Sequence, residues 1–436
     1  MQTNFTPVQL ADAGVQEADS ILRKCVHCGF CLSTCPTYAL LGDERDSPRG
    51  RIYLMKDMLE SGEVRDTAVR HIDRCLSCLA CTTSCPSGVD YMHLVDSARA
   101  RIEAEYTRPL ADRLFRTLLA VLLPRPWLFR LSLIVAIPGR WVAWGLPARL
   151  RRLVATAPRG GIPAPSPVHA PQVFAAHGPR RKRVALVQGC VQQVLGGRIS
   201  EATVRVLRGQ GCEVVVSEGA GCCGALPHHL GRLDEAKAFA KRNIAAWIRE
   251  DTERGLDAIV LNASGCGTTL RDYGHMFSDD PEWRDRAARV AALARDVSEV
   301  LTDLGGSTGA DLLGAPSIAY HDSCSLRHGQ GITRQPRDLL AKAGFVVAEV
   351  GEGHMCCGAA GTYNVLQPEI ADQLGARKAA NLAQTGAGAM ACANLGCMLH
   401  LARFTDLPMV HTVELLDWAA GGPRPEPMAR EPVANQ

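Results

Sequence analysis

Two features are scarce in this sequence of 436 residues: net charge and long apolar runs. The 48 Lys and Arg residues nearly balance the 45 Asp and Glu residues, which leaves a formal net charge of +3. A charge this small says little about partners. No nucleic-acid-binding motif is recognisable, so no nucleic-acid partner is expected. Hydrophobic residues make up 47% of the chain. A sizeable core is therefore expected, and the length indicates two or three domains.

The apolar runs that do occur are short. Residues 106–155 are rich in Leu, Trp and Arg, but Arg130, Pro138 and Arg140 interrupt them. The uninterrupted stretch is far below the ~20 residues that a membrane-spanning helix needs. Two interpretations remain for this segment. Helices that pack between domains are favoured, and a basic amphipathic surface that lies on a membrane or a partner is the alternative.

The start of the chain, from Met1 to Gly14, lacks the positively charged beginning and apolar core of a signal peptide. A cytoplasmic location is therefore expected, with peripheral attachment to the inner face of the membrane as an option. Thiols in that compartment stay reduced or bind metal. This argues against disulfides among the 18 cysteines.

No flavin or nicotinamide fingerprint stands out either. Residues 219–224 formally match the glycine-rich dinucleotide motif, but Pro227 interrupts the helix that should follow. A later copy of the same segment has Met355 in place of Gly221. Two-electron chemistry is therefore expected on another subunit, and any FAD would belong to that partner.

Cysteines dominate what is present, because residues 1–100 carry one cysteine pattern twice. Each copy reads C-x2-C-x2-C-x3-C-P, the run of bacterial ferredoxins. Zinc sites usually draw four ligands from two separated pairs, so one compact run of four cysteines favours an iron–sulfur cluster. The first copy contains Cys25, Cys28, Cys31 and Cys35, and the second contains Cys75, Cys78, Cys81 and Cys85.

Two such runs are typical of a domain that holds two [4Fe–4S] clusters and moves single electrons. Three thiolates of one tight turn bind three irons, and the fourth cysteine of each run binds the other cluster. Because these exchanged ligands tie the two runs together, the domain is expected to fold only with its clusters. The first cluster is assigned to Cys25, Cys28, Cys31 and Cys85, and the second to Cys75, Cys78, Cys81 and Cys35.

The secondary structure is predicted to change along the chain. Residues 1–100 are predicted to be mostly helical, and Ser47 with Pro48 is a typical helix start. Residues 156–182, rich in Pro, Gly and Ala, are interpreted as a linker. Beyond them, alternating elements indicate an α/β domain with parallel strands. Strands are predicted at 184–188, 213–216, 258–261, 317–320, 345–350 and 389–392, and helices near 198–209, 232–249, 334–343 and 368–383.

The C-terminal half contains a second duplication. A cysteine is followed after 31 residues by Cys-Cys-Gly, each copy closes with a Gly-Cys pair, and the two copies are offset by 134 residues. This predicts two similar lobes related by pseudo-symmetry. Each Cys-Cys-Gly turn is expected at the carboxyl end of a strand, where open α/β sheets place their ligands. The cysteines are Cys190, Cys222, Cys223 and Cys266 in the first copy, and Cys324, Cys356, Cys357 and Cys397 in the second.

Two uses of these cysteines are open. In the first, one or the other set of four binds a third iron–sulfur cluster, since adjacent cysteines suit two irons of an open cluster better than one zinc ion. In the second, the thiols rest at a substrate or quinone site. The candidate catalytic residues are then Cys222, Cys223, Cys356, Cys357 and His321.

The remaining cysteines and histidines near these turns are weaker candidates. Cys212 is interpreted as a core residue because Val346 stands at its counterpart position, and Cys392 is an additional candidate ligand. His321, beside Asp322, could bind a metal or move a proton. A structural role is favoured for His321 and for the other histidines near the turns, which are His228, His229, His328 and His354.

These patterns predict an α+β multidomain protein, with an N-terminal α-helical two-cluster ferredoxin domain followed by two duplicated α/β Cys-Cys-Gly lobes. The expected boundaries are 1–105 for the ferredoxin domain, 106–182 for an apolar basic helical connector with a Pro/Gly linker, 183–305 for the first lobe and 306–436 for the second.

The architecture resembles the iron–sulfur subunits of respiratory dehydrogenases, and within them the family of glycolate oxidase iron–sulfur subunits. Beyond the two duplications, several local sequences carry the resemblance. They are Met1-Gln-Thr-Asn-Phe, Ile21-Leu-Arg-Lys-Cys25-Val-His-Cys-Gly-Phe-Cys, Gly42-Asp-Glu, Ser47-Pro-Arg-Gly-Arg-Ile-Tyr-Leu and Cys85-Pro-Ser-Gly-Val.

The resemblance implies a complex in which a partner flavoprotein oxidises glycolate to glyoxylate. This chain would pass the electrons towards a quinone-type acceptor at the membrane. Equivalent subunits of lactate or glycerol-3-phosphate dehydrogenases are the alternative, as is a heterodisulfide-reductase-like enzyme with chemistry at the Cys-Cys-Gly turns. In heterodisulfide reductase these domains hold non-cubane clusters through a C-x2-C ending. Here Ala263 and Asn394 stand where its first cysteine would be, so cluster binding by the lobes stays open.

Overall fold

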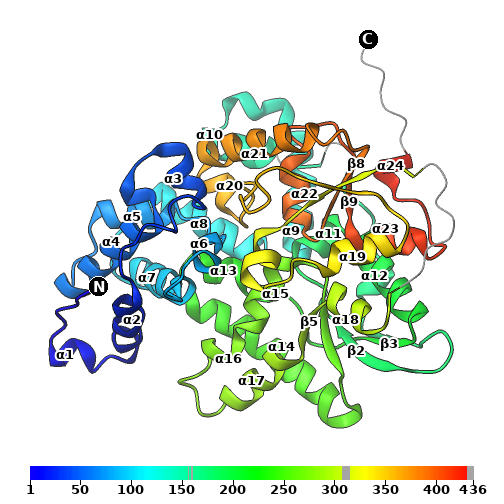
Figure 1. Cartoon of the computed structure of the whole chain (residues 1–436), viewed down its shortest axis with the longest axis horizontal. Helices are drawn as coiled ribbons and strands as arrows, with labels where there is room; N and C mark the ends of the chain where they lie inside the picture. Colours follow the sequence, from blue (N-terminus) through cyan, green and yellow to red (C-terminus); the bar gives the residue numbers. More distant parts are fainter. Residues whose placement is uncertain (156, 159–160, 307–314, 430–436) are drawn as a thin grey trace.

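The computed structural model of the chain describes residues 1–155, 157–158, 161–306 and 315–429. Parts of the predicted linker, at 156 and 159–160, and of the expected boundary between the lobes, at 307–314, lie outside the described residues. Figure 1 shows the N-terminal helices gathered at one side of the sheet-containing lobes.

The N-terminal part is helical, as predicted. Asp12 and Ser47 cap two of its longer helices by accepting hydrogen bonds from backbone amides, and Pro48 occupies the first turn of the second. Apolar side chains such as Leu22 and Met55 form one buried core with the cysteine turns at its edge. The helices are α1 (Pro7–Leu10), α2 (Ala13–Lys24), α3 (Pro36–Leu41), η1 (Glu44–Asp46), α4 (Pro48–Ser61), α5 (Asp66–Asp73), α6 (Ala80–Thr83) and α7 (Tyr91–Glu105).

The connector is helical and packs on both lobes through one face. Phe115 of α8 packs against Val365 of the second lobe, and Phe129 of α9 packs against Val194 of the first. The favoured packing interpretation therefore holds for this face. The elements are α8 (Leu110–Leu122), α9 (Pro126–Gly139), η2 (Arg140–Gly145) and α10 (Ala148–Ala155).

The opposite face of the connector is left uncovered. Trp127 and Trp144 are exposed, and Trp141 is 87% exposed, beside Leu131 and Ile134 of α9. In the part of the chain that the structure describes, no single helix is long and apolar enough to cross a membrane. Helices α8 and α9 pass that test only as a pair that is bent by 118°.

The first lobe is built on a five-stranded sheet in the order β1-β3-β2-β4-β5. Strands β2 to β5 are parallel, as predicted, but β1 at the end of the predicted linker pairs antiparallel with β3. Three residues are too few to show a strand period, so β1 and β5 were not expected from the sequence. The strands are β1 (Gln172–Phe174), β2 (Lys182–Leu186), β3 (Cys212–Val216), β4 (Ala258–Leu261) and β5 (Ala294–Asp296).

The second lobe repeats this arrangement with a four-stranded sheet in the order β7-β6-β8-β9. The register repeats as well: Val184 of β2 lies beside Ala258 of β4, and Ile318 of β6 lies beside Ala389 of β8. The predicted duplication and fold class are confirmed. The strands are β6 (Ile318–His321), β7 (Val347–Glu349), β8 (Ala389–Cys392) and the unpredicted β9 (Met409–His411).

Helices flank both sheets at or near the predicted positions. In the first lobe they are η3 (Pro167–His169), α11 (Val191–Leu195), α12 (Gly197–Gly209), α13 (Ala225–His229), α14 (Leu233–Arg254), α15 (Ser264–Arg271), α16 (Tyr273–Met276), α17 (Arg284–Leu293) and α18 (Val297–Asp303). In the second they are η4 (Ser325–Gly329), α19 (Gln335–Lys342), α20 (Tyr363–Leu366), α21 (Pro368–Ala383), α22 (Leu395–Leu401), α23 (Thr412–Ala419) and α24 (Glu426–Ala429).

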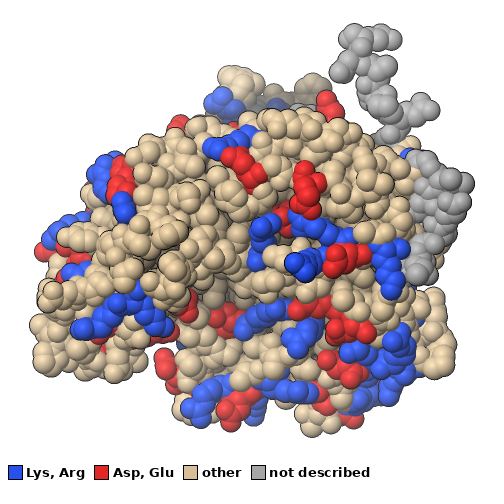
Figure 2. Space-filling view, in the orientation of Figure 1, with Lys and Arg blue, Asp and Glu red and all other residues tan. Residues whose placement is uncertain are grey.

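One apolar core runs through both lobes. Helix α12 packs on α23, and Arg205 pairs with Asp417 across this contact at 2.7 Å. Buried residues of both sheets, Cys212 among them, belong to the same cluster, which confirms the interpretation of Cys212 as core. On the face shown in Figure 2, basic and acidic side chains are interspersed rather than gathered by sign.

Candidate functional site

The two ferredoxin runs fold into the same backbone turn. His27 and Gly29 in the first run, and Ser77 and Leu79 in the second, adopt positive φ at equivalent places between the cysteines. This region is uncommon for residues other than glycine, and such strain persists only where the surrounding structure fixes the turn. The duplicated sequence therefore produces a duplicated local geometry that directs several thiols towards one point.

Four thiols of the first expected cluster line one small hollow. Its walls include Cys25, Cys28, Cys31 and Cys85, and also Cys81, which is assigned to the second cluster. Three of the four come from the first run and one from the second, which agrees with exchanged fourth ligands. Burial raises the pKa of the Cys31 thiol to about 11. The thiolate is therefore stable there only when a metal replaces the proton, so the donor set fits an iron–sulfur cluster.

The thiols of the second expected cluster lie around two buried cations. Burial alone would raise the pKa of Cys75, but the charges of Arg51 and Arg99 lower it below its ordinary value. The Nη1 atom of Arg51 lies 3.9 Å from Sγ of Cys35, and Arg99 donates a hydrogen bond to the Cys75 carbonyl at 2.6 Å. Burial raises the pKa of Cys81 well above its ordinary value, with Cys75 and Cys35 adding to the rise. These charges suit a site that holds several thiolates.

The glycine of each Cys-Cys-Gly turn is required by its surroundings. Gly224 and Gly358 both adopt positive φ, where a side chain is strained. A Cβ atom on Gly224 would lie 2.8 Å from the carbonyl oxygen of Ala236, and one on Gly358 would lie 2.5 Å from that of Ala371. Each turn is therefore pressed against the long helix that follows it, α14 or α21, which fixes the direction of the two preceding cysteines.

The four cysteines of each copy converge, so that both sets form a row of sulfur contacts. In the second lobe, Sγ of Cys324 lies 3.7 Å from Sγ of Cys356. The row continues through Cys357 and Cys397 to Cys392, which extends it beyond the four. In the first lobe the equivalent row runs through Cys190, Cys222, Cys223 and Cys266.

Both rows open into one cavity of about 1900 Å³ between the lobes and the connector. The carboxyl ends of strands from both sheets lead into it, as expected for open α/β sheets. Connector side chains such as Leu123, Phe129 and Leu133 line its other side. All eight lobe cysteines of the two predicted sets contribute to its wall.

The ferredoxin domain contacts the second lobe at its sulfur row. Cys78 and Cys356 belong to one buried cluster, and Cys324 packs against it. Burial raises the pKa of Cys78 well above its ordinary value, and Cys356 and Cys324 add to the rise. The second expected cluster site therefore adjoins the Cys-Cys-Gly turn of the second lobe.

The candidate histidines separate into different environments. Burial, reinforced by the charge of Lys378, lowers the pKa of His321 to about 3, so its imidazole is neutral. His328 contacts Thr83 Oγ1 at 2.7 Å and the His354 carbonyl at 3.1 Å, which fixes the lobe against the ferredoxin domain. Two more histidines face one carboxylate: His228 and His229 lie 3.9 and 4.0 Å from Asp96.

Several charged residues at these sites were missed by sequence reasoning. Three basic residues are buried beside cysteine turns: Arg51, Arg99 and Lys378. Each lies in a helix, where the sequence alone would predict that a basic side chain is exposed to solvent. Lys378 donates a hydrogen bond to the Glu352 carbonyl at 2.6 Å, beneath the second Cys-Cys-Gly turn. No motif in the sequence marks these positions.

His93 joins the ferredoxin domain to the first lobe. Its Nδ1 lies 2.7 Å from Asp90 and its Nε2 lies 2.7 Å from Asp272, and its ring stacks on His275 at 3.5 Å. Burial opposes the charge on this ring, but the two carboxylates prevail and raise the pKa of His93 to about 10. The contact is therefore an ion-paired bridge at neutral pH.

His93→Gln is expected to lower the free energy of unfolding by roughly 1–3 kcal/mol near neutral pH. The folded-state pKa is raised, so this contribution is complete below about pH 6.5 and is lost as pH rises through about 10. Denaturant titrations of both proteins between about pH 6 and pH 10.5 would measure it. A difference that stays constant over this range would contradict the ionic bridge.

Comparison with known proteins agrees with this arrangement. The 4Fe-4S dicluster domain family matches residues 21–89, and the Cysteine-rich domain family matches residues 184–271 and 318–402. The glycolate oxidase iron-sulfur subunit of Escherichia coli (strain K12) is 39% identical over 96% of this chain and 99% of its own length. The probable glycolate oxidase iron-sulfur subunit of Bacillus subtilis (strain 168) is 35% identical over 92% of this chain and 94% of its own.

Similarity to another group covers only part of the chain. Lactate utilization protein A of Bacillus subtilis (strain 168) is 28% identical over 54% of this chain and 99% of its own length. The matches, with the thiol sites above, show an iron–sulfur electron-transfer subunit of an oxidoreductase that carries [4Fe–4S] clusters. The chain belongs to the family of glycolate oxidase iron–sulfur subunits.

Proposed function

We propose that this chain is the electron-transfer subunit of a glycolate dehydrogenase, between a partner flavoprotein that oxidises glycolate to glyoxylate and a quinone-type acceptor. One observation carries the proposal: the thiol sites form a continuous path. It begins at the exposed Cys28, whose hollow Cys81 also lines, continues to the buried Cys78 beside Cys81, and reaches Cys324 and Cys356 at the cavity. The similarity to two glycolate oxidase subunits over nearly the whole chain supports the substrate.

The eight cysteines of the two ferredoxin runs are proposed to bind two clusters, each with three ligands from one run and one from the other. Cys25, Cys28, Cys31 and Cys85 hold the first [4Fe–4S] cluster, and Cys75, Cys78, Cys81 and Cys35 hold the second. When bound, these clusters supply one-electron transfer. Arg51 and Arg99 stabilise the negative charge of the second site. At least one lobe binds a further cluster, through Cys190, Cys222, Cys223 and Cys266 or through Cys324, Cys356, Cys357 and Cys397.

The partner flavoprotein is proposed to dock beside the first cluster site. Cys28 is exposed there, and Val26 and Phe30 next to it are each 66% exposed. Exposed apolar side chains around a redox site favour a protein partner that covers them. If the flavin donates its electrons to the first cluster, they enter the thiol path at the end that is farther from the lobes.

The acceptor is proposed to reach the lobe thiols through the cavity. The connector forms one wall of the cavity with its inner face and presents exposed Trp and Leu side chains on its outer face. Arg113 and Arg151 of the connector are exposed as well, so its solvent-facing side also suits an anionic surface. An apolar quinone held at a membrane would thus be close to the sulfur rows.

Lactate is the second candidate substrate, because the lactate utilization proteins match about half of this chain. The substrate can be tested with the purified chain and its co-purified flavoprotein under anaerobic conditions. Addition of glycolate is expected to bleach the visible absorption of the clusters, whereas lactate and glycerol 3-phosphate leave it unchanged. Bleaching by lactate alone would overturn the glycolate assignment.

The docking face can be tested in the same assay. Phe30→Glu is expected to slow cluster reduction by glycolate about tenfold or more, since a buried unpaired carboxylate opposes docking. Val346→Glu, at an exposed site on the second lobe, is the matched control and should leave the rate unchanged. Equal rates for the two variants would contradict docking at Phe30.

A further inference from the structure

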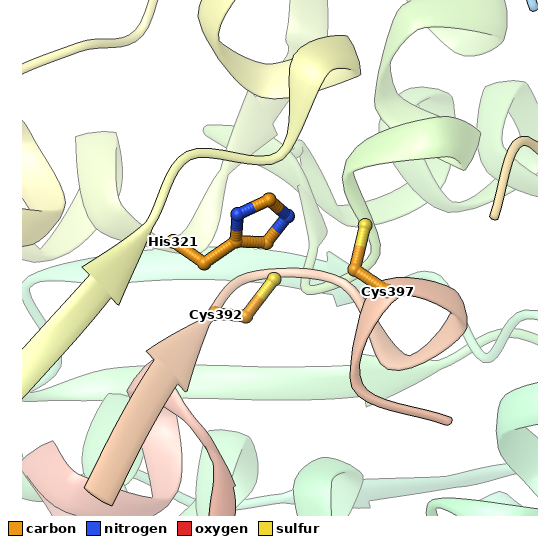
Figure 3. A group of neighbouring side chains, drawn as sticks. All are labelled: His321, Cys392 and Cys397. Atoms are coloured by element: carbon orange, nitrogen blue, oxygen red, sulfur yellow. The ribbon is translucent and has the colours of Figure 1, made fainter. Parts of the chain in front are cut away.

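One histidine and two cysteines form a group in the second lobe that the electron path does not use as a whole. The ligand atoms of His321, Cys392 and Cys397 all lie within 4.8 Å of one another, and all three residues are buried. Figure 3 shows the sulfur atom of Cys392 pointing to the imidazole ring of His321 and that of Cys397 beside the ring. Cys397 and Cys392 form the end of the sulfur row, which reaches them through Cys357.

The fold brings these residues together by strand register. His321 ends β6 and Cys392 ends β8, and the two are direct partners across these parallel strands. Partners in register point to the same face of a sheet. Cys397 follows in the first turn of α22, directly after β8. The arrangement is therefore built into the sheet and does not depend on a mobile loop.

The first lobe has the same positions without the same chemistry. The repeated register places Val187 where the second lobe has His321, and Leu261 where it has Cys392. Both are buried apolar residues. Cys266 is retained as the counterpart of Cys397. Since Val and Leu fill this space in one lobe, packing does not require an imidazole and a thiol in the other.

The imidazole also lacks a partner that would explain its burial. His321 is 2% exposed, and its Nε2 atom has no hydrogen-bond partner within the described residues. A buried polar atom left unpaired destabilises a fold, so such atoms call for a ligand. A neutral imidazole nitrogen beside two thiols is a donor set that Zn²⁺ and Fe²⁺ bind well, whereas ions such as Mg²⁺ prefer oxygen ligands.

We propose that His321, Cys392 and Cys397 bind a thiophilic divalent metal, Zn²⁺ or Fe²⁺, in the second lobe only. In a tetrahedral site with metal–ligand bonds of about 2.0–2.3 Å, ligand atoms lie roughly 3.3–3.8 Å apart. The group needs only small inward shifts to reach that geometry. Cys357, in contact with Cys397, is placed to supply the fourth ligand. The two lobes are then unequal, with a mixed nitrogen–sulfur site in one alone. Because Cys357 and Cys397 serve this metal, the further cluster of the proposed function belongs to the first lobe, at Cys190, Cys222, Cys223 and Cys266.

The twin lobe supplies matched substitutions for the test. His321→Val and Cys392→Leu install the residues that the first lobe uses at the same places, so both variants should fold. His400→Gln is the control, because this buried histidine in α22 bonds the Ala371 carbonyl instead. The measurements are zinc, iron and acid-labile sulfide per chain, with EPR of the reduced clusters and Mössbauer spectroscopy for a high-spin Fe²⁺ ion outside the clusters. The protein is the full chain, purified anaerobically.

Two positive results distinguish the metals. For zinc, about one ion per chain is lost in both variants while iron, sulfide and the EPR spectrum stay unchanged. For iron, about one Fe²⁺ per chain gives a high-spin ferrous Mössbauer doublet in the wild type and in His400→Gln, and this doublet is lost in His321→Val and Cys392→Leu. The proposal is overturned if the wild type has neither zinc nor this ferrous ion, or if both variants keep the metal that the wild type binds.

The proposed metal site does not depend on which substrate or acceptor the protein serves. Reduction of the ferredoxin clusters by glycolate and flavoprotein is expected to persist in His321→Val, since Cys25–Cys85 lie outside the group. If glycolate does not reduce the clusters of the wild-type protein, the result counts against the proposed function and leaves the metal site untouched. Unchanged metal content in the variants would count against the site alone.

Discussion

Cys85→Ser is expected to give the same EPR spectrum as Cys28→Ser and a different one from Cys78→Ser. The reason is the exchange of fourth ligands: Cys85 belongs to the second run in sequence but lines the hollow of the first cluster site. Each of these substitutions should remove one of the two cubane signals and abolish the magnetic interaction between them. Electron transfer from the flavoprotein to the acceptor should fall by about a hundredfold or more, because the thiol path is interrupted.

Cys35→Ser supplies the reciprocal experiment. Its spectrum should match that of Cys78→Ser, since Cys35 lies beside Arg51 and Cys75 rather than in the hollow of the first site. Iron analysis should show about half of the ferredoxin iron in all four variants. Cys212→Ser controls for loss of a buried thiol, because Cys212 is a core residue of the first sheet. A Cys85→Ser spectrum that matches Cys78→Ser would show that each run binds its own cluster.

The sequence predicted the repeated parts of this molecule well, because repetition makes a weak signal visible twice. The strands at Ala258–Leu261 and Ala389–Cys392 and the helix at Pro368–Ala383 agree with their predicted bounds. The missed strands β1, β5 and β9 have three residues each, and pairing with a neighbour, not local pattern, creates them. Their prediction requires the three-dimensional sheet.

The candidate sites were predictable in their cysteines and not in their surroundings. Spacing alone marks Cys25 and Cys324 as members of a set, because tight turns need fixed intervals. Nothing in the spacing indicates that Arg51 is buried 3.9 Å from a thiol or that Cys78 adjoins Cys356. Such contacts join segments far apart in the chain, and only tertiary packing decides them.

The asymmetry between the lobes shows the same limit. His321 stands out in the sequence only as a histidine near a cysteine, which is usually structural. The strand register shows that His321 lies opposite Cys392. It also shows that Val187 and Leu261 hold the equivalent positions in the first lobe, so His321 becomes a candidate metal ligand. A duplicated fold thus allows one lobe to be compared with the other. The apolar pair in the first lobe shows that packing at these positions needs only hydrophobic side chains.

Replacement of Trp127, Trp141 and Trp144 by serine is expected to release the protein from vesicles of anionic lipid. A tryptophan buries about 150–250 Å², and apolar burial contributes about 25 cal/mol per Å². Partial insertion of three side chains therefore contributes several kcal/mol, and their loss should weaken vesicle binding about a hundredfold or more. Co-sedimentation with vesicles measures this directly, and added salt should weaken the remaining binding by the Arg residues.

The same variant separates membrane docking from internal packing of the connector. The outer face carries the three tryptophans, whereas Phe115 and Phe129 hold the connector to the lobes and are unchanged. Electron transfer to a soluble dye should therefore persist while transfer to a membrane quinone falls. Tyr53→Ser, which removes an exposed aromatic ring from α4, is the matched control and should bind vesicles like the wild type. Full vesicle binding by the triple variant would show that the three tryptophans do not carry the membrane contact.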